Sequence, residues 1–160
     1  MTVHLHRPAR FLLLALLTLG LAACGPGQST ATNREVAQGR LVTVHKSPTC
    51  SCCEEHEAHL RHEGFATRTE VHDDIGAWKE AQGIPRELGS CHTSTVGGYL
   101  IEGHVPGDTI VRLLDEEPAI DGVALPGMPA GSPGMGGEQQ EPWIIQSFTD
   151  GEAGDVFDIR

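Results

Sequence analysis

Residues 41–64 have the sequence LVTVHKSPTCSCCEEHEAHLRHEG, which predicts the first strand and helix of the fold. It opens with the β-rich run LVTV, which predicts a strand over 41–44. Residues 50–63 contain no Gly or Pro and are followed by Gly64, a typical residue just past a helix end, so they predict a helix. A strand therefore passes through a cysteine-bearing loop into a helix.

The downstream sequence continues the alternation of strands and helices. The elements it predicts are a strand at 65–71, a helix from Asp73 or Asp74 to about Gln82, strands at 93–96 and 99–101 about a Gly97-Gly98 turn, and a helix starting at Pro106. This β-α-β-α-β-β-α order predicts an α/β fold of the thioredoxin-like arrangement, in which a parallel crossover is followed by an antiparallel hairpin and a closing helix.

The C-terminal part has a different composition. Residues 118–142 contain five Pro and six Gly, so we expect no regular element there, but a loop that is functional or packs over the domain as a flap. Residues 143–148 and 156–159 predict an added hairpin around Asp150-Gly151.

The N-terminus has the features of a targeting signal. Residues 1–10 carry two Arg and no acid, and the eleven residues 11–21 carry no charge. That run is too short for a transmembrane helix but fits the apolar part of a signal peptide. The motif Leu21-Ala22-Ala23-Cys24 resembles a bacterial lipobox, in which the Cys becomes lipidated. The alternative is an ordinary cleaved signal with an incidental Cys.

These features predict three parts of the chain: a lipoprotein signal peptide at 1–23, a flexible tether at 24–38 that begins with lipidated Cys24, and one domain at 39–160. The expected location is periplasmic and lipid-anchored, and Gly25 after the Cys favours the outer membrane. The membrane is then a partner only through the anchor.

The charge balance excludes one class of partner. The chain has 11 Lys and Arg against 22 Asp and Glu, a formal net charge of −11, so nucleic acid is not expected as a ligand. The sequence also lacks a Gly-rich phosphate loop of the G-x-x-x-x-G-K type and a G-x-S-x-G hydrolase motif.

Four cysteines outside the signal region are the main candidates for chemistry. Cys50, Cys52 and Cys53 form overlapping C-x-x-C and C-x-C motifs at a predicted helix N-terminus, where thiolates are stabilised. Cys91 comes just before the predicted hairpin, which in this topology faces the same corner. The four thiols are therefore expected to converge. The alternative is a set of structural disulfides, which an oxidising compartment favours.

Soft thiolate ligands favour Cu(I), Zn(II) or an iron–sulfur cluster. Structural zinc sites usually use two separated Cys pairs. The C-x-C-C spacing holds its sulfurs close together, which suits bridging thiolates and more than one Cu(I) ion.

The histidines and methionines are less specific signals. His56, His59 and His62 recur every three residues among acids, a pattern typical of a solvated polar helix face. His92 adjoins Cys91, so it is a candidate ligand or supporting group. Less specific candidates are His45, His104, Met128 and Met135, the two Met being within the Gly/Pro loop.

Four stretches resemble the CopG-like family of small bacterial periplasmic copper-resistance proteins, which is distinct from the DNA-binding repressor of the same name. They are VHKSPTCSCCEEH at 44–56, HLRHEGF at 59–65, ELGSCHTSTVGGYLIEGHVP at 87–106 and LPGMPAGSPGM at 125–135. Members often have Gly at the position of Ser51 and an aromatic residue at that of His56. The resemblance implies a thioredoxin-like fold and copper binding through Cys50, Cys52, Cys53 and Cys91, with His92 in the same motif.

The first hypothesis is therefore an extracytoplasmic protein that holds Cu(I) in a thiolate site for copper resistance and couples it to copper or thiol redox change. The second is a thiol–disulfide oxidoreductase in which Cys50 and Cys53 are the catalytic pair. The third is a copper buffer or chaperone without turnover. Other periplasmic copper-handling or redox proteins are the expected partners.

Overall fold

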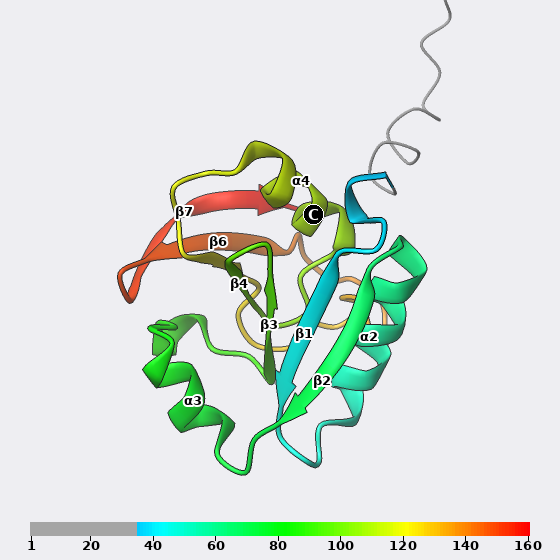
Figure 1. The fold of residues 1–160 in the computed structure, drawn as a ribbon, viewed down its shortest axis with the longest axis horizontal. Coiled ribbons are helices and arrows are strands. Elements are labelled where there is room, and N and C mark those ends of the chain that lie inside the picture. Colours follow the sequence, from blue (N-terminus) through cyan, green and yellow to red (C-terminus); the bar gives the residue numbers. More distant parts are fainter. Residues whose placement is uncertain (1–34) are drawn as a thin grey trace, which may run out of the picture.

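One seven-stranded sheet organises residues 35–160, the part of the chain that the computed structural model describes (Figure 1). Its strands are in the order β2-β1-β3-β4-β5-β6-β7. The elements are β1 (Leu41–Lys46), α2 (Ser51–Glu63), β2 (Ala66–Val71), α3 (Ile75–Ala81), the 3-10 turn η1 (Arg86–Leu88), β3 (His92–Val96), β4 (Tyr99–Glu102), α4 (Gly107–Glu116), β5 (Gly122–Ala124), β6 (Ile144–Thr149) and β7 (Glu152–Ile159).

The first four strands follow the predicted order. β1 and β2 are parallel and joined by α2, while β3 runs antiparallel to both β1 and β4. Gly97 and Gly98 both have positive φ, as the two-residue hairpin turn between β3 and β4 requires. The α2 helix ends at Gly64, whose φ of 106° is a left-handed cap. The sequence-based prediction of a mixed α/β fold is therefore confirmed.

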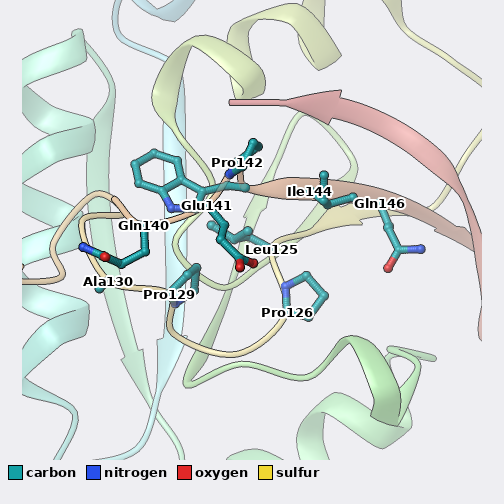
Figure 2. Close-up of a pocket in the computed structure, with 10 residues that line it drawn as sticks. Leu125, Pro126, Pro129, Ala130, Gln140, Glu141, Pro142, Ile144 and Gln146 are labelled. Atoms are coloured by element: carbon teal, nitrogen blue, oxygen red, sulfur yellow. The ribbon is translucent and has the colours of Figure 1, made fainter. Parts of the chain in front are cut away.

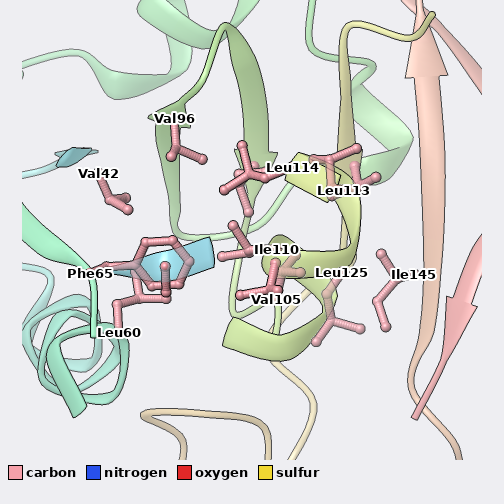
Figure 3. Close-up of a cluster of buried hydrophobic side chains, with 14 of the residues drawn as sticks. Val42, Leu60, Phe65, Val96, Val105, Ile110, Leu113, Leu114, Leu125 and Ile145 are labelled. Carbon is pink, nitrogen blue, oxygen red and sulfur yellow. The ribbon is translucent and has the colours of Figure 1, made fainter. Parts of the chain in front are cut away.

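The two faces of the sheet are covered by different helices. The larger core lies between the sheet and α2 with α4, and Figure 3 shows Val42, Leu60, Phe65, Ile110 and Leu113 converging in it. A smaller cluster of Ile84, Leu88, Ala124 and Phe148 packs on the other face, with Trp78 of α3 against it. Because side chains alternate along a strand, neighbouring residues of β1 point into different environments.

The C-terminal part departs from the prediction at one point. Residues 118–142 were expected to contain no regular element, but β5 lies within them and pairs parallel to β4. The strand forms because Val123 and Ala124 are fully buried between the two cores, and Gly122 allows Leu100 and Phe148 to approach closely. The added hairpin is confirmed: β6 and β7 pair around Asp150-Gly151, and β7 begins earlier than predicted, at Glu152.

The predicted signal peptide and Cys24 lie outside the described residues. Within 35–160, no helix combines the length and apolar character needed to cross a membrane. The packed core already includes Ala37, which is fully buried, and Val36 packs against it. The folded part therefore starts before residue 39, inside the segment predicted as tether.

Candidate metal centre

Three of the four cysteines lie where β1 leads into α2. Cys50 is the residue before the first turn of the helix and has extended backbone geometry, and Cys52 and Cys53 lie in that turn. The buried Lys46 side chain fixes the loop, since Nζ donates to Cys50 O at 3.2 Å and to Glu54 Oε1 at 2.8 Å. The hydrogen bond from Lys46 to Glu54 and the positive charge of Lys46 lower the pKa of the Glu54 carboxyl.

The four sulfurs form one group, as the sequence predicts. The Sγ atoms of Cys50, Cys52, Cys53 and Cys91 all lie within 4.8 Å of one another. Cys50 and Cys53 form a disulfide, while Cys52 and Cys91 are free thiols. Cys52 Sγ is 3.6 Å from Cys50 Sγ and 3.8 Å from Cys91 Sγ. Cys91, which is 38 residues from Cys53 in the sequence, is thus an equal member of the group.

A buried carboxylate holds the loop that carries Cys91. Glu102 is fully buried on β4 and accepts hydrogen bonds from Ser90 N at 2.6 Å and from the Thr93 hydroxyl. It also forms an ion pair with Lys79 of α3, whose side chain is 11 % exposed. The carboxylate therefore satisfies donors on both sides of Cys91 and ties them to α3.

Two histidines aim ring nitrogens at the Cys91 sulfur. His92 Nδ1 lies 3.2 Å and His104 Nε2 3.0 Å from Cys91 Sγ. The hairpin explains this arrangement, because β3 and β4 pair Thr93 with Glu102, and the register continued outward places Cys91 opposite His104. Both rings are fully buried.

Backbone carbonyls determine which nitrogens of these rings carry hydrogen. His104 Nδ1 is 2.7 Å from Pro133 O and must donate to it, so a neutral ring has its lone pair on Nε2, toward Cys91. His56 Nε2 likewise donates to Val105 O at 3.0 Å. Its Nδ1 then accepts from His92 Nε2 at 2.9 Å, which leaves the His92 lone pair on Nδ1, again toward Cys91. Two imidazole lone pairs therefore meet one sulfur.

Burial sets the protonation of these groups. It lowers the pKa of His104, lowers that of His92 well below its ordinary value, and lowers that of His56 to about 3. Burial and the neighbouring Cys52 raise the pKa of the Cys91 thiol to about 12. At neutral pH the imidazoles are uncharged and Cys91 keeps its proton, so a metal ion that binds here must displace that proton.

A strap formed by residues 126–137 of the Gly/Pro-rich loop closes the site from the helix side. Besides the Pro133–His104 hydrogen bond, Gly134 lies against the α2 backbone, where a Cβ at this residue would be 2.5 Å from His56 N. The φ of Gly134 is +82°. The expectation that this loop packs over the domain is therefore met. A role for Met128 or Met135 as a thioether ligand stays a prediction.

The interpretation of the three α2 histidines as a solvated face is wrong for His56, which is fully buried beneath the strap and between His92 and His104. His59 is half-buried and accepts from Gly107 N at 3.2 Å, at the start of α4. His62 is exposed, as expected. His104, ranked low from sequence, is in contact with the sulfur group.

A separate cavity of about 420 Å³ lies between residues 125–130 and 140–146 (Figure 2). Pro126, Pro129 and Pro142 form part of its wall, and Glu141 also borders it. No Cys or His is among the described residues that line it. The Cys and His side chains that could hold a metal ion therefore lie outside this cavity.

Two comparisons match the chain to known proteins. A family model described as a protein of unknown function, DUF411, matches residues 88–135, which include Cys91, His92, His104 and the strap. Two solved structures of a copper resistance protein CopG, Form 2 and Form 1, are each 37 % identical to the chain and cover 77 % of it. Their TM-scores are 0.70 and 0.69, and the match spans 99 % and 98 % of those chains.

These likenesses indicate the class of copper resistance proteins. The chain belongs to the CopG family of copper resistance proteins. No curated protein matches it.

Proposed function

We propose that this protein binds Cu(I) at the cysteine group as part of copper resistance. The observation that carries the proposal is the convergence of four cysteine sulfurs within 4.8 Å, in a chain whose relatives are copper resistance proteins. Soft thiolates are preferred ligands of Cu(I). Copper is the cargo in this proposal, and the site residues are Cys50, Cys52, Cys53 and Cys91.

The spacing of the sulfurs supports more than one copper ion. Cys52 lies between Cys50 and Cys91, at 3.6 and 3.8 Å, so its sulfur is placed to bridge two ions. His92 and His104 add neutral nitrogen donors beside Cys91. The reduced site thus offers four sulfurs and two nitrogens, which exceeds the need of a single Cu(I).

The disulfide gives the site a redox step. Cys50 and Cys53 can act as thiolate ligands only after their S–S bond is broken by two electrons. If two Cu(I) ions supply those electrons, two Cu(II) ions form, the S–S bond breaks and the two sulfurs take up two protons or bind metal. Oxidation of two Cu(I) ions and two-electron reduction of the disulfide are then balanced at one site.

The second candidate function is thiol–disulfide exchange by Cys50 and Cys53 with copper binding incidental. The specific observation in its favour is that these two residues, and not Cys52 or Cys91, form the disulfide. We also propose that the fold is thioredoxin-like, a relation supported by the strand order β2-β1-β3-β4 and by the cysteines between β1 and α2. A buffer or chaperone without turnover is the third reading.

The periplasmic location, the lipid anchor at Cys24 and the outer-membrane preference remain part of this proposal. They rest on the sequence of residues 1–24 and on the disulfide, which is typical of oxidising compartments.

Anaerobic Cu(I) titration of the reduced full chain against a competing chelator tests the copper proposal. Cys91→Ser is expected to lower the number of Cu(I) ions bound while the far-UV circular dichroism stays unchanged, whereas the matched control Cys24→Ser binds as the parent does. Unchanged stoichiometry in Cys91→Ser would exclude Cys91 as a ligand. If the parent takes up no Cu(I), trapping of a mixed disulfide by Cys53→Ser becomes the test of the second function.

A further inference from the structure

A second group of possible metal ligands lies at the ends of β1 and β2, apart from the cysteines. His45 is on β1, Glu70 is on β2, and His72 directly follows β2. One ligand atom from each lies within 4.8 Å of the other two. The group faces α3, because the His45 ring stacks on Trp78 with centroids 4.1 Å apart, whereas the next side chain, Lys46, reaches the cysteine loop on the other face.

We propose that His45, Glu70 and His72 bind a divalent cation of the borderline class, Cu²⁺ in preference to Zn²⁺. Two imidazoles and one carboxylate suit these ions, and the Irving–Williams order gives Cu²⁺ the higher affinity. The cysteine group, with its soft sulfurs, takes no part in this site.

The distances fit a metal ion in the middle of the group. With metal–nitrogen and metal–oxygen bonds of about 2.0–2.2 Å, neighbouring ligands lie about 2.8–3.1 Å apart around a tetragonal ion such as Cu²⁺ and about 3.3 Å apart around a tetrahedral one. His45 Nδ1 is 3.0 Å from His72 Nε2 and 3.5 Å from Glu70 Oε2. Small adjustments of the exposed Glu70 side chain and the half-buried His72 ring are therefore enough to admit the ion.

When the His45 ring carries its hydrogen on Nε2, the group has more acceptors than protons. His45 Nε2 lies 3.5 Å from the Thr95 hydroxyl, and a hydrogen on that nitrogen leaves the His45 lone pair on Nδ1, toward His72 and Glu70. At most one shared proton then lies between two ring nitrogens and a carboxylate oxygen. A cation that replaces this proton satisfies all three acceptors.

The surroundings leave a route for the ion and fix the ligand geometry. The Glu70 side chain is 45 % exposed and His72 is half-buried, so the group opens to solvent, while His45 is held under Trp78. Arg68 forms an ion pair with Glu70 Oε1 at 3.1 Å, and its positive charge disfavours the binding of a cation nearby. The other carboxylate oxygen, Oε2, still faces His45. The carboxylate is therefore expected to bind through one oxygen.

Trp78 supplies a direct readout, since bound Cu²⁺ quenches the fluorescence of an indole in contact with its ligands. The chain has two Trp, and Trp143→Phe leaves Trp78 as the only one. Cys24→Ser, Cys52→Ser and Cys91→Ser in the same full chain, kept oxidised so that the Cys50–Cys53 disulfide remains, remove every free thiol. Binding through the free thiols of the cysteine group, and reduction of Cu²⁺ by those thiols, are then prevented.

Titration of this chain with Cu²⁺ is expected to give saturable quenching from a single site, reversed by excess Zn²⁺. His72→Gln should weaken binding at least about tenfold, and Glu70→Gln should weaken it less. His62→Gln, which changes an exposed histidine on α2, is the matched control and should bind as the parent does.

Equal binding by His72→Gln and the parent, or no saturable quenching in a chain that circular dichroism shows to be folded, would overturn the proposal. Because the cysteine group is disabled in this experiment, the result is independent of the Cu(I) titration proposed above.

Discussion

The two faces of the sheet at the end of β1 carry different chemistry on adjacent residues. Lys46 points toward α2 and fixes the cysteine loop, where sulfurs and buried imidazoles meet beneath a strap. His45 points toward α3 and joins Glu70 and His72 in a group that opens to solvent. Since side chains alternate along a strand, one strand end can present soft donors on one face and nitrogen and oxygen donors on the other.

Glu102 links these two regions, and its replacement is expected to have the largest effect. Glu102→Gln removes the charge that compensates Lys79 of α3 and weakens the hydrogen bonds to Ser90 and Thr93 beside Cys91. Removing one member of a buried ion pair leaves the other charge unpaired, which lowers the free energy of unfolding by about 3 kcal/mol or more. Urea unfolding measures this loss, with an unchanged m-value if the variant remains two-state.

The control for this prediction is Glu80→Gln, which breaks the exposed pair between Glu80 and Arg86. Exposed pairs contribute about 1 kcal/mol or less, so this variant should be close to the parent. Equal losses in the two variants would show that Glu102 does not tie the faces together.

The strap allows the cysteine face to be disturbed alone. Gly134→Ala imposes a positive φ on Ala and places its Cβ 2.5 Å from His56 N, so a loss of about 2 kcal/mol is expected, together with faster reaction of Cys91 with a thiol reagent. Gly127→Ala is the matched control, because its φ is +70° but a Cβ there meets nothing within 4 Å. If both variants lose the same stability, the contact with α2 contributes nothing.

Acid should also weaken the cysteine face through its buried histidines. Burial lowers the pKa of His56 from an ordinary 6.5 to about 3, so between these pH values the unfolded chain binds a proton that the folded chain does not. Stability is fully present above pH 6.5 and is lost as the pH falls, by up to about 1.4 kcal/mol per pH unit for this one residue.

His56→Phe should therefore reduce the slope of unfolding free energy against pH between pH 6 and 4 by about that amount, roughly 1.4 kcal/mol per pH unit, while His92 and His104 keep their contributions. Urea unfolding at several pH values gives both slopes. A slope that does not change would mean that His56 takes up a proton in the folded chain.

The smallest expected effect concerns Lys46. Lys46→Met removes the hydrogen bond and the charge that lower the Glu54 pKa, which should rise toward its ordinary value in a carbon-detected NMR titration. Arg68→Gln, on the β2 edge and paired with Glu70, is the control and should leave the Glu54 pKa where it is. A response to both changes would mean that the two faces are coupled electrostatically.

Much of the cysteine group could be predicted because local signals determine it. The C-x-C-C motif lies at a helix start that Gly64 and the absence of Gly and Pro over 50–63 define, and Cys91 directly precedes a hairpin strand. His104 was given too low a rank as a candidate ligand, although the Gly97-Gly98 turn predicts the strand register that places it. A two-residue turn pairs Val96 with Tyr99, and counting outward along the register reaches Cys91 opposite His104.

The burial of His56 and the His45 group could not be found in the same way. His56 is covered by the strap, and a Gly/Pro-rich segment has no periodicity from which its path can be inferred. His45 lies beside Glu70 because of the parallel register of β1 and β2. The two strands are joined by a helix and not by a tight turn, so the sequence does not fix their register. β5 was missed because three residues are too few to give a strand pattern.

The depth of the imidazoles has a consequence for the order in which an ion meets its ligands. His92, His104 and Cys53 are fully buried, whereas Cys50, Cys52 and Cys91 keep some exposure. An ion that approaches from solvent would therefore meet sulfur before nitrogen. Hard ions such as Mg²⁺ or Ca²⁺ bind sulfur poorly, so this order would disfavour them during entry as well as at equilibrium.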